Sequence, residues 1–238
     1  MEERFYEYSA YGEYNRFTNL DGIESKIIAH LLTSSSKHAN LFWKVLKYDT
    51  KDALSCPDLT MAEKLELVEG TADNPTGGIT DSTRLFLSPF VDDAWIKQSS
   101  SVYIFVDDVY PIDHTRANIS VTVETVIHSR INVVYGDADF IANPQTNPND
   151  YYYTDSDTPT VKYKSRASVL LKCILAELNG LYLDGIGYLQ FTTDQTLDNS
   201  KVRGKATLSL FNGRSFFGHS IKFNLGISGV SDDGDGGF

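Results

Sequence analysis

Residues 101–135 constrain the fold of this chain more than any other part of its sequence. They open with five consecutive apolar residues, 102–106, which is typical of a strand buried on both faces. A polar segment containing Pro111, residues 107–117, follows and is expected to form a turn region. Apolar and polar residues then alternate over 119–124, the pattern of a strand with one face in water. β-Branched and aromatic residues continue to Tyr135, so the stretch predicts the central strands of one sheet.

Helical and strand patterns on either side of this stretch predict the fold class. Apolar residues recur at helical spacing in three segments, which predict helices at 22–32 (capped by Asp21), 38–48 and 166–183 (capped by Ser165). A capping box of Thr60 and Glu63 predicts a further short helix at 60–69. Further strands are expected at 84–87, 188–192, 205–211 and 220–227. The last helix carries a broad apolar face that includes Cys173 and is expected to cover the sheet. The sequence therefore predicts a single α+β domain with a mixed or antiparallel β-sheet covered by helices.

Two long segments exceed what such a domain needs. Residues 1–20 form a long, aromatic-rich N-terminal arm, and residues 137–159 form a long inserted loop. We expect residues 21–228 to be the domain and residues 229–238 to be a flexible, acidic, glycine-rich tail. Aromatic side chains gain from burial, so the arm either packs on its own domain or lies across a neighbouring subunit. The candidate subunit-interface residues are Phe5, Tyr6, Tyr8, Tyr11, Tyr14, Phe17, Tyr151, Tyr152 and Tyr153.

Charge and composition limit the partners of this protein. The net charge is −11, with 32 acidic against 21 basic residues, whereas nucleic-acid binding requires a basic footprint. The basic clusters at 162–166 and 201–205 are interpreted as solvated loops, so DNA is disfavoured as a ligand. No apolar run approaches the roughly 18 residues of a membrane span, and the N-terminus does not have the pattern of a signal peptide. With only two, widely separated cysteines, we expect a soluble protein that folds in a reducing cytoplasm.

The residues that are able to carry chemistry form no recognised catalytic pattern. Acidic residues and histidines gather near the central strands, and as metal ligands they would be Asp107, Asp108, Asp113, His114, Glu124, His128, Asp137 and Asp139. Their spacing matches neither a calcium loop nor a zinc-binding helix, and turns are rich in aspartate for backbone reasons alone. The short glycine motif at 185–187 is interpreted as a helix stop. No cofactor, metal site or enzymatic activity is therefore expected, and the residues alone indicate a soluble α+β domain.

The order of short sequence phrases resembles the head–tail joining proteins of tailed bacteriophages, which are neck, head-completion and tail-terminator ring subunits. The resemblance covers residues 20–228, and its phrases lie at 40–49, 52–55, 57–59, 83–90, 101–108, 119–134 and 166–183. In chain order, the phrases correspond to a first helix, an acidic segment where that helix ends, and a strand that begins with an arginine and precedes a proline. Paired strands and then a helix followed by strands complete the order. The long arm and the inserted loop are additions that would suit a short-tailed phage, such as one of the crAss-like group.

This resemblance implies a structural role in the virion. A subunit of this family would form a ring of six or twelve copies, contact portal, adaptor and tail proteins, and let DNA pass without specific binding. Such a protein would assemble in the host cytoplasm and remain in the particle. Two other hypotheses stay open: a metal-dependent phage enzyme that uses the acidic cluster near Asp107, Asp108 and Glu124, and a tail-associated adaptor or carbohydrate-binding module with exposed tyrosines.

Overall fold

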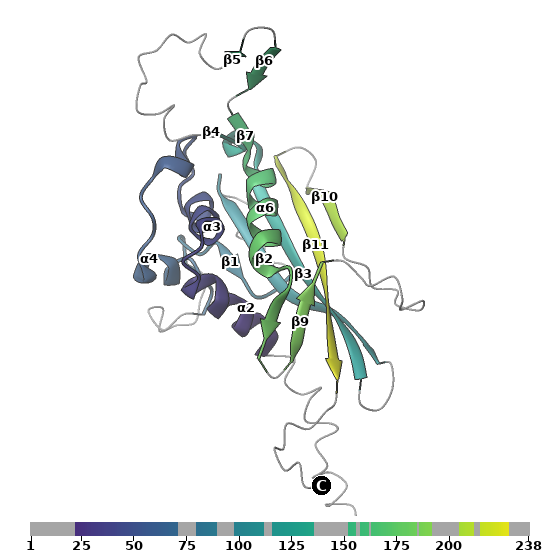
Figure 1. The fold of residues 1–238 in the computed structure, drawn as a ribbon. Helices are drawn as coiled ribbons and strands as arrows, with labels where there is room; N and C mark the ends of the chain where they lie inside the picture. Colours follow the sequence, from purple (N-terminus) through teal and green to yellow (C-terminus); the bar gives the residue numbers. More distant parts are fainter. Residues whose placement is uncertain are drawn as a thin grey trace, which may run out of the picture.

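In the computed structural model, helices pack against one face of a curled β-sheet (Figure 1). The structure describes residues 22–70, 80–89, 98–111, 116–135, 152–155, 158–161, 163–184, 186–191, 205–211 and 215–228. The helices are α2 (Gly22–Thr33), α3 (Lys37–Lys47), α4 (Met61–Leu65) and α6 (Arg166–Leu178), with 3₁₀ turns η2 (Ala53–Ser55) and η4 (Ser129–Ile131). The strands are β1 (Leu85–Phe86), β2 (Ser100–Pro111), β3 (Arg116–His128), β4 (Val133–Tyr135), β5 (Tyr152–Asp155), β6 (Thr158–Val161), β7 (Tyr163–Ser165), β8 (Leu181–Leu183), β9 (Gly187–Gln190), β10 (Lys205–Phe211) and β11 (Phe216–Ser228).

The main sheet is mixed, and the α+β prediction is confirmed. Its order is β1-β2-β3-β11-β9-β8, and β10 also pairs with β11. The pair β1–β2 is parallel, and the other pairs of this sheet are antiparallel. Strands β10 and β9 lie end to end along the same edge of β11, because β10 pairs with residues 216–222 and β9 pairs with residues 224–225. Two smaller sheets, β4–β7 and β5–β6, lie outside the main sheet.

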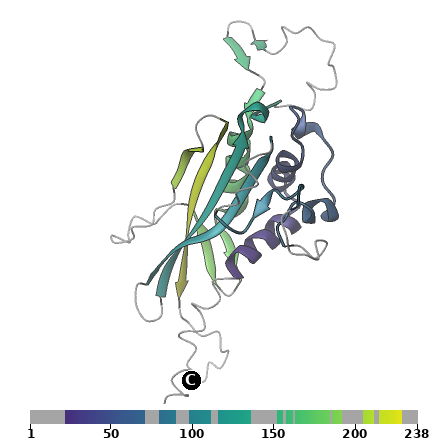
Figure 2. The same ribbon diagram turned by 180° about the vertical axis from the view of Figure 1, so that it is seen from behind.

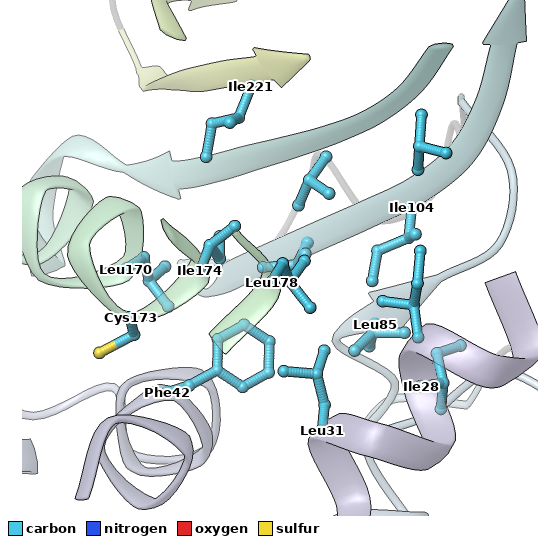
Figure 3. Packing of buried hydrophobic residues seen from close by; sticks show 14 of the residues in the cluster. Ile28, Leu31, Phe42, Leu85, Ile104, Leu170, Cys173, Ile174, Leu178 and Ile221 are labelled. Carbon is cyan, nitrogen blue, oxygen red and sulfur yellow. The ribbon is translucent and has the colours of Figure 1, made fainter. Parts of the chain in front are cut away.

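The hydrophobic core lies between the main sheet and helices α2, α3 and α6. Alternate residues of the three central strands face the helices, and the register aligns Ile104 with Val123 and Val123 with Ile221. Figure 3 shows side chains of α2, α3 and α6 converging on these strands; the labelled ones are Ile28, Leu31, Phe42, Leu85, Ile104, Leu170, Cys173, Ile174, Leu178 and Ile221. The predicted helix-on-sheet core is therefore present, with Cys173 buried in it.

Helix α2 bridges two edges of the curled sheet. The carboxylate of Glu24 accepts a hydrogen bond from the backbone N–H of Val106, 2.9 Å away, on the outer edge of β2. Two residues further on, the Lys26 ammonium donates to the carbonyl oxygen of Asp184, which directly follows the edge strand β8. Exposed strand edges invite unwanted pairing, and side chains that bond to them prevent it. One helix thus bonds both to the outer edge of β2 and to the residue that follows β8.

A fully buried arginine joins three elements at the other end of the core. Arg166 begins α6, and its guanidinium donates four hydrogen bonds to backbone carbonyl oxygens, with donor–acceptor distances of 2.6–2.9 Å; the acceptors are Val45, Tyr48, Thr50 and Ile131. Two of these carbonyls lie at the C-terminal end of α3, where a positive charge is favoured by the helix dipole. Burial lowers the pKa of Arg166, and the nearby Asp49 opposes this shift. The prediction that the basic cluster at 162–166 is solvated is therefore wrong for Arg166.

The helix caps follow the expected chemistry. Thr60 and Glu63 form the predicted capping box at α4, with the Thr60 N–H donating to the Glu63 carboxylate over 2.8 Å. Hydrogen bonds from Lys47 and from Thr60 lower the pKa of Glu63 to about 2. Helix α4 is shorter than expected and ends at Leu65. The expected cap Asp21 lies outside the described residues.

Three further expectations are corrected. Residues 107–111 continue β2 instead of turning, because a β-bulge between Val106 and Asp108 accommodates the polar residues. Helix α6 ends at Leu178, since Gly180 adopts φ 85° and the chain returns as β8; the glycine motif at 185–187 lies beyond that strand and does not stop the helix. The inserted segment expected as a loop contains the hairpin β5–β6 over 152–161.

One glycine of β11 is required by close backbone packing. Gly218 is buried beside β3, and a Cβ atom there would overlap the carbonyl oxygen of Thr125. The Thr125 hydroxyl accepts a hydrogen bond from the His219 N–H, 2.8 Å away, at the same place. The two strands therefore approach so closely that only glycine fits.

Candidate functional site

The clearest candidate for a functional surface is the β5–β6 hairpin. It carries Tyr152 and Tyr153 on β5, and both views show it extending away from the helix-covered sheet (Figures 1 and 2). In the described part of the chain, β5 and β6 pair only with each other, from the pair of Tyr152 and Val161 to the pair of Asp155 and Thr158. The other predicted interface residues, Phe5, Tyr6, Tyr8, Tyr11, Tyr14, Phe17 and Tyr151, lie outside the described residues.

A second aromatic surface is formed by two tyrosines that the sequence analysis did not single out. Tyr182 on β8 and Tyr188 on β9 are direct cross-strand neighbours, and their ring centroids are 4.9 Å apart. They are 53% and 58% exposed, because the alternating Leu183 and Leu189 occupy the core side of the same hairpin. The alternation of leucine and tyrosine in residues 181–183 was the signal that a strand, not a helix, begins there.

The sheet face opposite the helices carries a polar network. The bulge in β2 turns both Asp107 and Asp108 toward this face. Lys222 of β11 reaches across β3 to form an ion pair with Asp107, and the Tyr110 hydroxyl donates to Asp108 over 2.8 Å. The hydrogen bond from Lys222 to Asp107 raises the pKa of Lys222, and the bond to Asp108 raises the pKa of Tyr110. The ion pair thus links β2 and β11 through their side chains across β3.

The contacts of this network count against a metal site in the acidic cluster near Asp107, Asp108 and Glu124. Among the residues that the structure describes, no group of three histidine, cysteine, aspartate or glutamate side chains is arranged to hold a metal ion. Asp107 forms an ion pair with Lys222. Glu124 lies on β3 opposite Tyr103, which is nearer the start of β2 than Asp107 is. Burial raises the pKa of Tyr103 to about 12, so its phenol stays protonated. The remaining candidates, Asp113, His114, Asp137 and Asp139, lie outside the described residues.

A buried carboxylate connects helices α2, α3 and α6. Glu177 accepts hydrogen bonds from the hydroxyls of Ser34 (2.9 Å, to Oε2) and Ser36 (to Oε1), and the Nε2 atom of His30 lies 3.4 Å from Oε2, the oxygen that Ser34 also binds. Although burial raises the pKa of Glu177, the hydrogen bonds from Ser36 and Ser34 and the nearby His30 lower it further, below its usual value. In a nucleophilic triad the imidazole lies between the hydroxyl and the carboxylate, whereas here the carboxylate lies in the middle. The arrangement therefore connects helices and does not activate a nucleophile.

Neither cysteine has the environment of a reactive thiol. Cys173 is 1% exposed, and burial raises its pKa to about 12. Burial also raises the pKa of Cys56. A reactive cysteine needs a lowered pKa, so both thiols stay protonated near neutral pH. The prediction of a buried, unreactive Cys173 agrees with this environment.

Comparison with known proteins yields no relative for this chain: no protein-family model, curated protein sequence or solved structure matches it. Among the described helices, none combines the length and the apolar character needed to cross a membrane.

Proposed function

We propose that this protein is a virion structural subunit of a tailed bacteriophage that forms a closed ring at the head–tail connection. In this role, six or twelve copies join the portal side to the tail side at the neck or tail-terminator position and leave a channel for DNA. The observation that carries the proposal is the β5–β6 hairpin, which lies outside the main sheet and pairs only with itself in the described part of the chain.

The energetics of a lone hairpin favour a partner for it. An isolated two-stranded hairpin is marginally stable in water and usually needs a third strand or a packed face. Tyr152 and Tyr153 add aromatic side chains, which provide large contact areas at interfaces for little loss of conformational entropy. A ring has heterologous interfaces in which each copy offers two different surfaces, and a projecting hairpin is suited to be one of them.

The charge of the chain fits passage of DNA without binding. With a net charge of −11, a ring of copies would repel the phosphate backbone unless its basic residues were gathered on the channel wall. The genome would therefore slide through the ring instead of adhering to it.

A carbohydrate-binding or tail-associated adaptor module is the second candidate. It rests on the exposed Tyr182–Tyr188 pair, because aromatic side chains exposed in this way contact sugar rings and partner proteins. Retention on an array of host glycans that is lost in the Y182S/Y188S variant would support this candidate over the ring subunit.

Native mass spectrometry of the purified chain over a concentration series, with and without magnesium, tests the ring. We expect closed oligomers of six or twelve copies whose mass does not depend on magnesium. A chain that remains monomeric at every concentration, and that proteomics does not detect in purified particles, would overturn the proposal. A melting temperature that rises when magnesium, manganese or calcium is added would instead favour the metal-dependent enzyme.

A further inference from the structure

We infer that a neutral oligosaccharide binds along a row of five residues that crosses the main sheet on the face opposite the helices. From one side of the sheet to the other, the members of the row are Tyr182 (β8), Tyr188 (β9), Gly226 (β11), Asn118 (β3) and Tyr110 (β2). The inference is separate from the proposed ring. It rests on the second candidate function, a carbohydrate-binding module, and deepens it by naming the whole site and the class of sugar.

Strand pairing places the members of the row side by side. The register pairs neighbouring members directly in three of the four steps: Tyr110–Asn118, Asn118–Gly226 and Tyr188–Tyr182. In the remaining step Leu225 of β11 pairs with Leu189 of β9, so that the next residues along the two strands are Gly226 and Tyr188. Adjacent strands lie about 4.8 Å apart, which makes the row about 19 Å long.

The row lies on the surface and away from the core. Side chains alternate between the two faces of a strand, and the residues next to members of the row belong to the hydrophobic core: Ile119, Leu183, Leu189 and Leu225. Figure 2 looks onto the face that carries the row, with α6 behind the sheet. Tyr182, Tyr188 and Gly226 are exposed, and Tyr110 and Asn118 are partly exposed. A ligand therefore has access to all five residues.

Gly226 leaves room in the middle of the row. For a Cβ atom placed on Gly226, the only described atom within 4 Å would be Asn118 Oδ1, at 3.9 Å. Strands β9 and β11 nevertheless lie close together here, since a Cβ atom on Gly187 would be 2.5 Å from the Gly226 carbonyl oxygen. The room beside Tyr188 thus comes from the missing side chain and not from separated strands.

The chemistry of the row suits a sugar. The rings of Tyr182 and Tyr188, with centroids 4.9 Å apart, offer apolar faces, and their hydroxyls are polar. Asn118 and the exposed Gln190, which lies two residues beyond Tyr188 on the same face of β9, add amides that donate and accept hydrogen bonds. A few polar groups beside aromatic rings are typical of small-ligand sites.

The exposed apolar area is too small for a stable protein interface. Such an interface buries about 800 Å² on each partner around an apolar centre. On the described parts of β8, β9 and β11, Tyr182 and Tyr188 are the only large hydrophobic side chains that are exposed. Two rings are enough to contact a sugar but do not form the centre of a protein interface.

Charge favours a neutral sugar over a sulfated or sialylated one. Asp108 lies on the same face as the row and accepts a hydrogen bond from the Tyr110 hydroxyl over 2.8 Å, a neutral donor that leaves the carboxylate negative. Lys222, a cation on this face, is already engaged by Asp107. A negative group on the ligand would therefore meet a like charge, whereas a sugar hydroxyl would find an acceptor.

The first test is retention of the full chain on an array of neutral, sialylated and sulfated glycans. We expect retention on neutral glycans, lost in the Y182S/Y188S variant. Stronger retention on sialylated or sulfated glycans would overturn the inference and leave the carbohydrate-binding candidate standing. Retention on no glycan would overturn both. If, in addition, Y182S/Y188S dispersed the ring in native mass spectrometry, the two tyrosines would be a contact between copies.

A graded series at Gly226 tests the middle of the row by calorimetric titration with a retained neutral hexasaccharide. Gly226→Leu fills the space between Tyr188 and Asn118 and should weaken binding at least about tenfold. Gly226→Ala adds one methyl group at ordinary contact distance from Asn118 Oδ1, so its affinity should change less than about threefold. Both variants should keep the wild-type urea midpoint. Wild-type affinity in a folded Gly226→Leu variant would overturn the inference.

The length of the glycan separates the whole row from the tyrosine pair alone. Tyr110 lies three strand spacings, about 14 Å, from Tyr188. Tyr110→Ser should therefore weaken binding of the hexasaccharide about fivefold and leave binding of the matching disaccharide unchanged, whereas Tyr182→Ser should weaken both. Met61→Ser, an exposed side chain on α4, is the control and should change neither. If only Tyr182→Ser has an effect, the inference fails and the carbohydrate-binding candidate stands.

Discussion

Replacing Arg166 by methionine is the most direct test of what holds the helical layer together. The methionine retains an unbranched apolar stem of similar length but removes the guanidinium, which makes four hydrogen bonds of 2.6–2.9 Å to backbone carbonyls. Each buried acceptor that loses its donor costs about 1–3 kcal/mol. The total for the four carbonyls is smaller than four times this cost, because the surrounding structure relaxes and water enters the site. The saved cost of burying the charge offsets part of the loss. We therefore expect the free energy of unfolding to fall by about 3–5 kcal/mol.

Urea unfolding followed by far-ultraviolet circular dichroism measures this change. For a chain of this size, about 4 kcal/mol corresponds to a melting temperature lower by roughly 8–16 °C. Arg166→Lys keeps the charge and up to three donors, so it should lose about half as much. The exposed Arg130, replaced by methionine, is the control and should change stability by less than about 0.5 kcal/mol. A loss below about 1 kcal/mol for Arg166→Met would refute the claim that these hydrogen bonds stabilise the fold.

Three further changes test other contacts. Gly218→Ala should cost at least about 3 kcal/mol or abolish folding, because its Cβ would overlap the Thr125 carbonyl; an unchanged urea midpoint would contradict the close strand packing. Trp43→Phe removes the indole donor to the Leu31 carbonyl (2.8 Å) and leaves a void, so thermal melting should show a loss of about 2–3 kcal/mol. The lowered pKa of Glu177 means that its contribution to stability is present above its usual pKa of 4.5 and is lost as the pH falls through the lower folded-state value. Glu177→Gln should therefore lower stability at pH 7 and flatten the decline below pH 4.5, and an unchanged acid profile would count against this role.

Local patterns predicted the element types well, because the information lay within each segment. The capping box of Thr60 and Glu63 and the bounds of β10 follow from neighbouring residues and agree with the structure. The end of α6 was misplaced, since apolar residues continue at a spacing compatible with a helix past Leu178. The Asn179–Gly180 pair, with Gly180 at φ 85°, is what ends the helix.

The errors that matter for function came from contacts between distant parts of the chain. Arg166 stands among basic residues in sequence, yet its hydrogen-bond partner Val45 is 121 residues away. Asp107 was expected in a turn, but Lys222, 115 residues away, supplies a counter-charge that lets it stay in a strand. No local pattern records such partners, so burial of charge could not be foreseen from the sequence.

The position of α2 has a mechanical consequence. The helix begins at residue 22, and both of its contacts with strand edges, from Glu24 and Lys26, lie in its first two turns. Tension on the segment that precedes it would act on these two contacts before it reached the apolar residues Ile27, Ile28 and Leu31. The fold would thus respond to a pull on the N-terminal side by releasing the edges of β2 and β8 first, while helices α3 and α6 remained packed on the sheet.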